Sequence, residues 1–133
     1  MPPRLDHITV TAGDFATSLA FYDATLGALG WVRSLELGDE EEDDPAVEVA
    51  GWGPPDEPVA LWLVTGAVAT RGLHVALAVG AVDAVERMYA AALASGGVGH
   101  DAPRRWPIIR RGEFNAIVAD PDGNLIEAVA PEA

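Results

Sequence analysis

Two histidines and one glutamate have the residue types and positions needed to bind a metal ion. His7 and His74 each begin a run of alternating residues, and Glu127 is the single acid within the apolar run NLIEAVA. An unpaired carboxylate is costly to bury among apolar neighbours. Imidazole and carboxylate groups are ligands for divalent metals, so one shared ion would account for all three residues. The alternative is three unrelated polar residues, each hydrogen-bonded and without chemistry.

The two histidines occupy equivalent positions of an internal repeat. When His7 is placed over His74, HITVTAGDFATSLAFYDATLGALG aligns with HVALAVGAVDAVERMYAAALASGG. Each copy begins with period-2 alternation, typical of a strand, and continues with helical spacing. Asp14 is expected to cap the first helix, and Gly27 or Gly30 to end it. The apolar stripes of the two helices are Phe15, Leu19, Tyr22 and Leu26, then Val82, Val85, Met88, Tyr89 and Leu93.

Short strand-like runs follow each predicted helix. They cover about residues 31–37, 46–52, 58–65, 98–104, 112–119 and 124–130, and the last two are joined by the turn DPDGN. The sequence therefore predicts an α+β fold of two tandem βαβββ modules. The modules span about residues 5–66 and 72–130 of a single domain, 1–133.

Alternation predicts which face of each opening strand carries the histidine. Large apolar residues are expected to pack on the helices, namely Ile8, Val10, Val75, Leu77 and Val79. The other face then carries His7 with Thr9 and Thr11 in one module, and His74 with Ala76 and Ala78 in the other. The stretch HVALAV is also apolar on both faces, which is typical of a strand buried on both sides.

Composition excludes several function classes. The net charge of −13 argues against nucleic acid and anionic membranes as partners. The sequence contains no cysteine, and its eight basic residues are all arginines, which excludes thiolate and Schiff-base chemistry. There is no signal-peptide pattern and no apolar segment of bilayer length, so a cytoplasmic location is expected. The acidic run GDEEEDDP, residues 38–45, is typical of a solvated loop.

The chain resembles the vicinal oxygen chelate superfamily, which includes glyoxalase I, extradiol dioxygenases and bleomycin-resistance proteins. The resemblance rests on DHITV, FYDATLGALGW, GWGPPDEPVALWL, GLHVALAV, YAAALASGG and ADPDGNLIEAV, and it covers nearly the whole chain. It implies a cup-shaped, eight-stranded mixed sheet with the helices on its outer face and a divalent metal inside. It also implies a homodimer, and leaves open whether one chain or two supply the ligands.

The resemblance assigns the ligand positions to His7, His74 and Glu127. A 2-His-1-carboxylate set leaves open positions for substrate oxygens and favours Fe(II) or Mn(II), with Zn(II) or Ni(II) as alternatives. Glyoxalase I has a fourth protein ligand where this chain has Trp62, which cannot ligate. Lactoylglutathione isomerisation is therefore not expected. The family resemblance identifies no residue here as the catalytic acid or base.

Five residues are candidates for contact with a substrate. Trp62 and Phe114 could line the cavity or simply pack in the core, and Asn115 stands where relatives carry aromatic residues. Arg110 and Arg111, in the run RRWPIIRR, could bind a carboxylate or phosphate. The alternative for these arginines is a solvated loop or a subunit contact.

Two functions remain open from the sequence. The first is a metal-dependent enzyme of glyoxalase or dioxygenase type, in which the metal acts as a Lewis acid on a small substrate that chelates it through oxygens. The second is a metal-free binding protein of the bleomycin-resistance type that sequesters a cationic or planar ligand. The acidic charge and the four tryptophans suit the second function, whereas His7, His74 and Glu127 favour the first.

Overall fold

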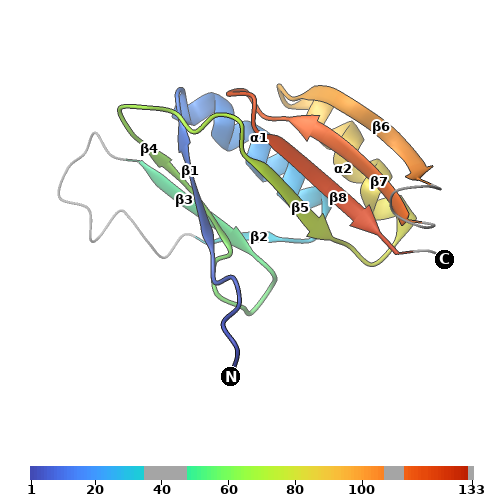
Figure 1. Cartoon of the computed structure of the whole chain (residues 1–133). Helices are drawn as coiled ribbons and strands as arrows, with labels where there is room; N and C mark the ends of the chain where they lie inside the picture. Colours follow the sequence, from blue (N-terminus) through green and yellow to red (C-terminus); the bar gives the residue numbers. More distant parts are fainter. Residues whose placement is uncertain (35–47, 107–112, 132–133) are drawn as a thin grey trace.

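The computed structural model describes residues 1–34, 48–106 and 113–131, which form two successive βαβββ modules (Figure 1). The elements of the first module are β1 (Ile8–Ala12), α1 (Phe15–Ala28), β2 (Val32–Ser34), β3 (Val49–Gly53) and β4 (Leu61–Thr65). Those of the second are β5 (His74–Ala78), α2 (Val82–Ala94), β6 (Val98–Trp106), β7 (Glu113–Ala119) and β8 (Leu125–Ala130). The predicted fold class, with its tandem βαβββ modules, is confirmed.

The strands form two four-stranded sheets, with the orders β1-β4-β3-β2 and β5-β8-β7-β6. In each sheet the first and last strands of the module pair in parallel and the other neighbours are antiparallel. Among the described residues no strand pairing joins the two sheets. The strands β1 and β5, which carry or adjoin the two histidines, are therefore both edge strands of separate sheets.

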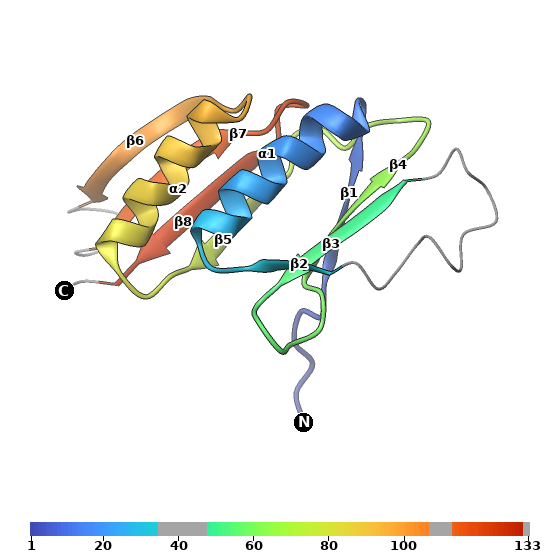
Figure 2. The same ribbon diagram turned by 180° about the vertical axis from the view of Figure 1, so that it is seen from behind.

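Both helices lie on the same side of the molecule. Figure 2 shows α1 and α2 next to each other over this side, and the opposite face of the sheets is free of helices. The helix α1 packs against α2 as well as against β2 and β4, so it is buried on two sides. A Cβ atom at Gly97 would lie 2.5 Å from the ring of Phe21, which shows how closely the two modules approach there. No helix in the described ranges is long and apolar enough to cross a membrane.

The predicted signals for the ends of α1 have clear structural counterparts. Oδ1 of Asp14 accepts a hydrogen bond from the backbone amide of Thr17 at 3.1 Å, which confirms the N-cap. Gly30 follows the helix with a φ of +91°, a conformation that suits glycine. Gly27 lies inside the helix instead.

One predicted core position of α2 is wrong. Leu93 is 45% exposed, whereas its neighbour Ala92 is fully buried. Ala92 continues the helical spacing of Val85 and Met88, which places it on the buried face. The amide of Gly97 also donates to the carbonyl of Ala92 at 2.9 Å, just after the helix ends.

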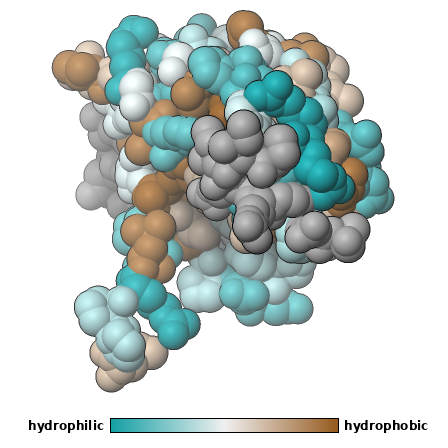
Figure 3. All heavy atoms as spheres, turned by 45° about the vertical axis from the view of Figure 1, so that its right-hand side comes forward, coloured by the Kyte–Doolittle hydropathy of each residue, from teal (hydrophilic) through white to brown (hydrophobic). Residues whose placement is uncertain are grey.

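The opening strands have the predicted faces. Val10 is buried on the helix side, and Val75 and Leu77 pack against the same core. His74, with the other residues of its face, is exposed, so the prediction of a strand buried on both sides is wrong for a single chain. Ala76 and Ala78 are the exposed apolar residues of that face. Figure 3 shows, on one side of the molecule, a band of hydrophobic surface directly above the N-terminal tail.

A buried carboxylate connects the first helix to the last turn of the second module. In the predicted DPDGN turn, the amide of Gly123 donates to the carbonyl of Asp120 at 3.0 Å. Asp120 is 3% exposed, and its Oδ2 accepts from the hydroxyl of Tyr22 at 2.5 Å. Its Oδ1 accepts from the backbone amides of Asp122 and Asn124, at 2.9 and 2.8 Å. These bonds tie α1 of one module to the β7–β8 turn of the other.

Asn124 extends this connection to the segment between the modules. Its Nδ2 donates to Oδ2 of Asp120 at 3.0 Å and to the carbonyl of Thr70 at 2.8 Å. Its Oδ1 accepts from the amide of Leu73 at 3.0 Å. Thr70 is itself bonded to β1, because its Oγ1 accepts from the amide of Thr11 at 2.9 Å. Polar groups thus hold both modules and their connection together.

Burial, followed by the charge of Asp120, raises the pKa of the Tyr22 hydroxyl far above its usual value near 10. Tyr22 therefore ionises in the unfolded chain above about pH 10 while it stays protonated in the folded protein. We expect the stabilisation from this group to be complete below pH 10. Above it, the group's contribution should fall by about 1.4 kcal/mol per pH unit.

The Tyr22→Phe variant removes this dependence on pH. It should be about 1–3 kcal/mol less stable than wild type at pH 8, because Asp120 loses a donor. Above about pH 10 the difference between the two proteins should narrow. Urea unfolding at pH 8, 10 and 11 measures both effects. Parallel stability profiles over this range would contradict the prediction.

Candidate metal centre

His74 and Glu127 lie against each other on the helix-free face of the second sheet. The strands β5 and β8 pair in parallel, with His74 opposite Leu125 and Ala76 opposite Glu127. This register puts the histidine and the glutamate diagonally across from one another on one face. Nε2 of His74 lies 2.8 Å from Oε1 of Glu127. The histidine side chain is 50% exposed and that of the glutamate 10% exposed, so the pair is open on the histidine side.

The chemistry of this pair suits a divalent metal ion. Two donor atoms that bind one ion at about 2.1 Å and at a right angle are about 3 Å apart, close to the separation observed here. The nitrogen and the oxygen are within hydrogen-bonding distance of each other, and a bound ion would replace that contact. Two of the three predicted ligands are therefore brought together by strand register alone.

His7 has a different partner. Its Nδ1 lies 2.7 Å from Oδ1 of Asp6, and both side chains are largely exposed. A carboxylate on one ring nitrogen is a usual companion of metal-binding histidines, because it orients the ring and leaves the other nitrogen for the metal. Within the described part of the chain, however, no three acidic or histidine side chains are grouped closely enough to hold an ion. One chain thus presents the pair His74–Glu127 and, apart from it, His7.

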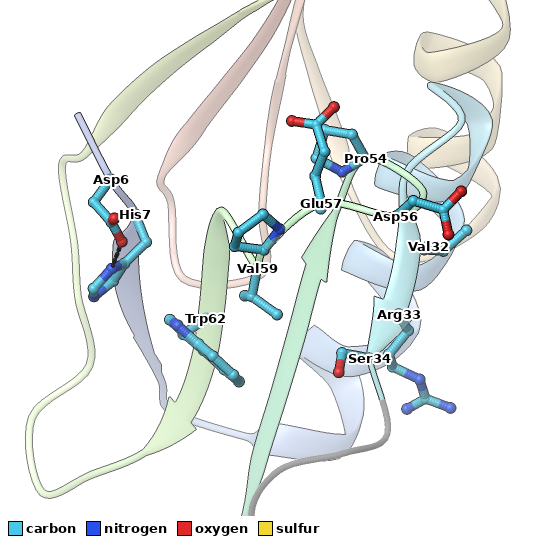
Figure 4. A pocket seen from close by; sticks show the side chains of 12 residues that line it. Asp6, His7, Val32, Arg33, Ser34, Pro54, Asp56, Glu57, Val59 and Trp62 are labelled. Carbon is cyan, nitrogen blue, oxygen red and sulfur yellow. Dashed lines mark hydrogen bonds and ion pairs between the residues drawn. The ribbon is translucent and has the colours of Figure 1, made fainter. Parts of the chain in front are cut away.

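His7 lies at the edge of a pocket of about 1010 Å³ in the first module. Figure 4 shows Asp6 and His7 on one side of this pocket and Trp62 at its base. Trp62 lies over Gly51 of the neighbouring strand, where a Cβ atom would be 2.7 Å from the indole ring. The remaining residues that line the pocket are Val32, Arg33, Ser34, Gly53, Pro54, Asp56, Glu57, Pro58 and Val59.

The other predicted substrate residues have different surroundings. Asn115 is 6% exposed, and its Nδ2 donates to Oε2 of Glu127 at 2.6 Å. Phe114 points to the other side of β7, where it packs against the core with the guanidinium of Arg105 at 5.7 Å from its ring. Arg110 and Arg111 lie outside the described residues, as does the acidic run. The structure therefore brings Asn115, rather than Phe114, to the predicted metal ligands.

Sequence reasoning missed two contacts of the candidate ligands. The contact of Asp6 with His7 had a local signal, since the residues are adjacent in the chain. The hydrogen bond from Asn115 to Glu127 had none, because it depends on the antiparallel register of β7 and β8, in which Ile117 is opposite Glu127. Only a known strand pairing would have identified it.

The comparison with known proteins agrees with this architecture. The profile of the glyoxalase/bleomycin resistance protein/dioxygenase superfamily matches residues 4–128. The chain belongs to this superfamily. The resemblance seen in the sequence is thereby confirmed, although no curated protein matches the chain.

Solved structures of the glyoxalase superfamily share the fold. A glyoxalase/bleomycin resistance protein from Albidiferax ferrireducens T118 is 25% identical, with a TM-score of 0.72 over 95% of this chain and 97% of that one. A glyoxalase/bleomycin resistance protein/dioxygenase domain from Frankia sp. EAN1pec is 15% identical, with a TM-score of 0.70 over 99% and 94%. A glyoxalase I mutant from Zea mays is 24% identical, with a TM-score of 0.67, and is matched over 46% of its length. The last two likenesses concern the fold alone.

Proposed function

We propose that this glyoxalase-superfamily protein is a divalent-metal-dependent enzyme of glyoxalase or dioxygenase type. Its substrate is a small molecule that chelates the metal through oxygen atoms. The observation that carries the proposal is the contact of His74 with Glu127 at 2.8 Å on the helix-free face. An apolar strand face with a histidine and a nearly buried carboxylate in contact is a poor arrangement for folding stability and a good one for binding a cation.

We further propose that the complete site forms between two copies of the chain. His7 of one copy would join His74 and Glu127 of the other. The support is that one chain separates these ligands, and that no strand of the described structure pairs with the outer edge of β1 or of β5. An apolar edge strand left open is a liability that proteins usually cover. A homodimer that covers both edges would also bury Ala76 and Ala78.

The residues that would hold the ion are His7, His74 and Glu127, and Fe(II) or Mn(II) suits this set best. A bound ion would supply Lewis-acid polarisation of the substrate oxygens. Trp62, held flat over Gly51, offers an aromatic face on which a planar substrate can pack. Because Trp62 occupies the position of the fourth ligand of glyoxalase I, ring-cleaving or other dioxygenase chemistry fits this protein better than isomerisation.

Metal analysis tests the proposal. Protein purified without chelator, reconstituted separately with Fe(II), Mn(II) and Zn(II) and desalted, should retain close to one metal ion per chain for at least one of them. Elemental analysis measures the stoichiometry. A retained content below about 0.1 ion per chain for all three metals would overturn the enzyme function, because three converging ligands should bind at micromolar metal.

A second candidate function is supported by the pocket of the first module. Asp6, Asp56 and Glu57 line it together with Trp62. The arginine of the lining, Arg33, has its Nε 3.4 Å from Oδ1 of Asp23, which offsets its positive charge. This acidic and aromatic lining suits a cationic planar ligand bound without metal. Quenching of tryptophan fluorescence by bleomycin in protein that retains no metal would favour this function over the enzyme.

A further inference from the structure

The side-chain amide of Asn115 has one hydrogen-bond partner among the described residues, the carboxylate of Glu127. The residue lies on β7 opposite Val129, so Glu127 is its diagonal neighbour on the same face of the sheet. Its Nδ2 donates to Oε2 of Glu127 at 2.6 Å, while Oε1 of the same carboxylate faces His74 at 2.8 Å. The two carboxylate oxygens are thus engaged by two different residues on two different strands.

We propose that Asn115 is a positioning residue that presents Glu127 to the metal through Oε1 only. The proposal rests on the metal site proposed above. The last torsion of a glutamate side chain is broad and only weakly restricted. A hydrogen bond to Oε2 removes this freedom and keeps Oε1 directed at Nε2 of His74. A metal ion bound here would be held by Glu127 through Oε1 alone, which would leave positions for the two histidines and for substrate.

The opposite end of the Asn115 amide supports a role in function rather than in folding. Asn115 is 6% exposed, and its Oδ1 is buried without a hydrogen-bond partner among the residues that the structure describes. A buried amide carbonyl without a partner is unfavourable, because no hydrogen bond offsets its removal from solvent. Asn124, the buried asparagine of the DPDGN turn, uses both ends of its amide instead. The unpaired carbonyl of Asn115 therefore lowers the stability of the fold, and a role in folding alone does not explain why an asparagine is placed here.

The substitution Asn115→Leu tests the proposal, because leucine has the same branched shape, although it is bulkier, and cannot donate a hydrogen bond to Glu127. In the full-length protein we expect the Kd for Mn(II), measured by calorimetric titration, to rise about 10–100-fold. The visible absorption spectrum of the Co(II)-substituted protein should also change, because the freed carboxylate can bind through both oxygens. A purely structural role would lower the melting temperature of the metal-free protein and leave the Co(II) spectrum as in wild type.

Ile117→Val is the matched control. Ile117 lies on the same face of β7 and directly opposite Glu127, with no polar group. This variant should bind Mn(II) with a Kd within about twofold of wild type. If Asn115→Leu does not fold, as judged by circular dichroism, Asn115→Ser replaces it, since the shorter hydroxyl cannot make the same direct bond.

The outcomes separate this proposal from the proposed function. A wild-type protein that binds no metal overturns both. A wild-type protein that binds metal, with an Asn115 variant whose Co(II) spectrum is unchanged, overturns the positioning role alone, whatever the Kd of the variant. Weakened binding with a changed spectrum, and a control that behaves as wild type, supports it.

Discussion

A mixture of His7→Ala and Glu127→Ala proteins should bind Mn(II), although neither variant binds it tightly by itself. Each substitution removes one ligand and should weaken Mn(II) binding by more than about 100-fold. Loss of a residue that only hydrogen-bonds to a ligand already lowers metal affinity about 10–100-fold. If the site lies between two chains, a mixed dimer contains one intact site, made from the unchanged ligands of each variant. After random subunit exchange, about a quarter of the wild-type number of sites should reappear.

A second mixture serves as the control. His74 and Glu127 are in contact within one chain, so both must come from the same copy. In a mixture of His74→Ala and Glu127→Ala, every site therefore lacks one of these two ligands. No binding should return in that mixture. Calorimetric titration after exchange, with mass spectrometry to show that mixed dimers have formed, measures both cases. Full exchange without recovery in the first mixture would contradict a site shared between chains.

The substitution Asp120→Ala should have the largest effect on stability. Its carboxylate is 3% exposed and accepts hydrogen bonds from the Tyr22 hydroxyl, two backbone amides and the side chain of Asn124. Alanine cannot accept a hydrogen bond through its side chain, so all four donors lose their acceptor at this buried position. We expect a loss of about 3–5 kcal/mol, a large part of the 5–15 kcal/mol typical of a domain.

Urea unfolding at pH 7.5 measures this loss. Asp83→Ala is the control, because Asp83 is a 70% exposed carboxylate whose contact with Arg87 at 2.7 Å is on the surface of α2. Its loss should cost less than about 0.5 kcal/mol. A change below about 1 kcal/mol for Asp120→Ala would show that water replaces the carboxylate, and that these bonds do not hold the modules together.

The proposed metal site and the buried carboxylate are linked by a short stretch of β8. Asp120 and Asn124 anchor the turn that precedes this strand, and Glu127 follows three residues after Asn124. The register of β8 against β5 depends on where this turn is held, and that register brings Glu127 to His74. The network that joins the modules thereby also places one ligand of the proposed site.

The internal repeat and the fold class could be predicted because their signals are local. Alternation alone determines that Val10 faces the helices and that His74 does not, since successive side chains point to opposite faces of a strand. The capping of α1 by Asp14 is likewise local, because its partner Thr17 is only three positions further along the chain. Leu93 was the exception, because either Ala92 or Leu93 can continue an apolar stripe, and only the packing of the folded chain decides that Ala92 is the buried one.

The sequence by itself determined the two modules, the faces of their opening strands and the choice of His7, His74 and Glu127 as the proposed metal ligands. Only the tertiary structure decided that His74 meets Glu127, that Asn115 holds the carboxylate, that Phe114 belongs to the core, and that His7 lies apart. The physical reason is that faces follow from the geometry of a single strand. Contacts between strands depend instead on register and on the packing of α1 against α2, where residues far apart in the chain determine the outcome.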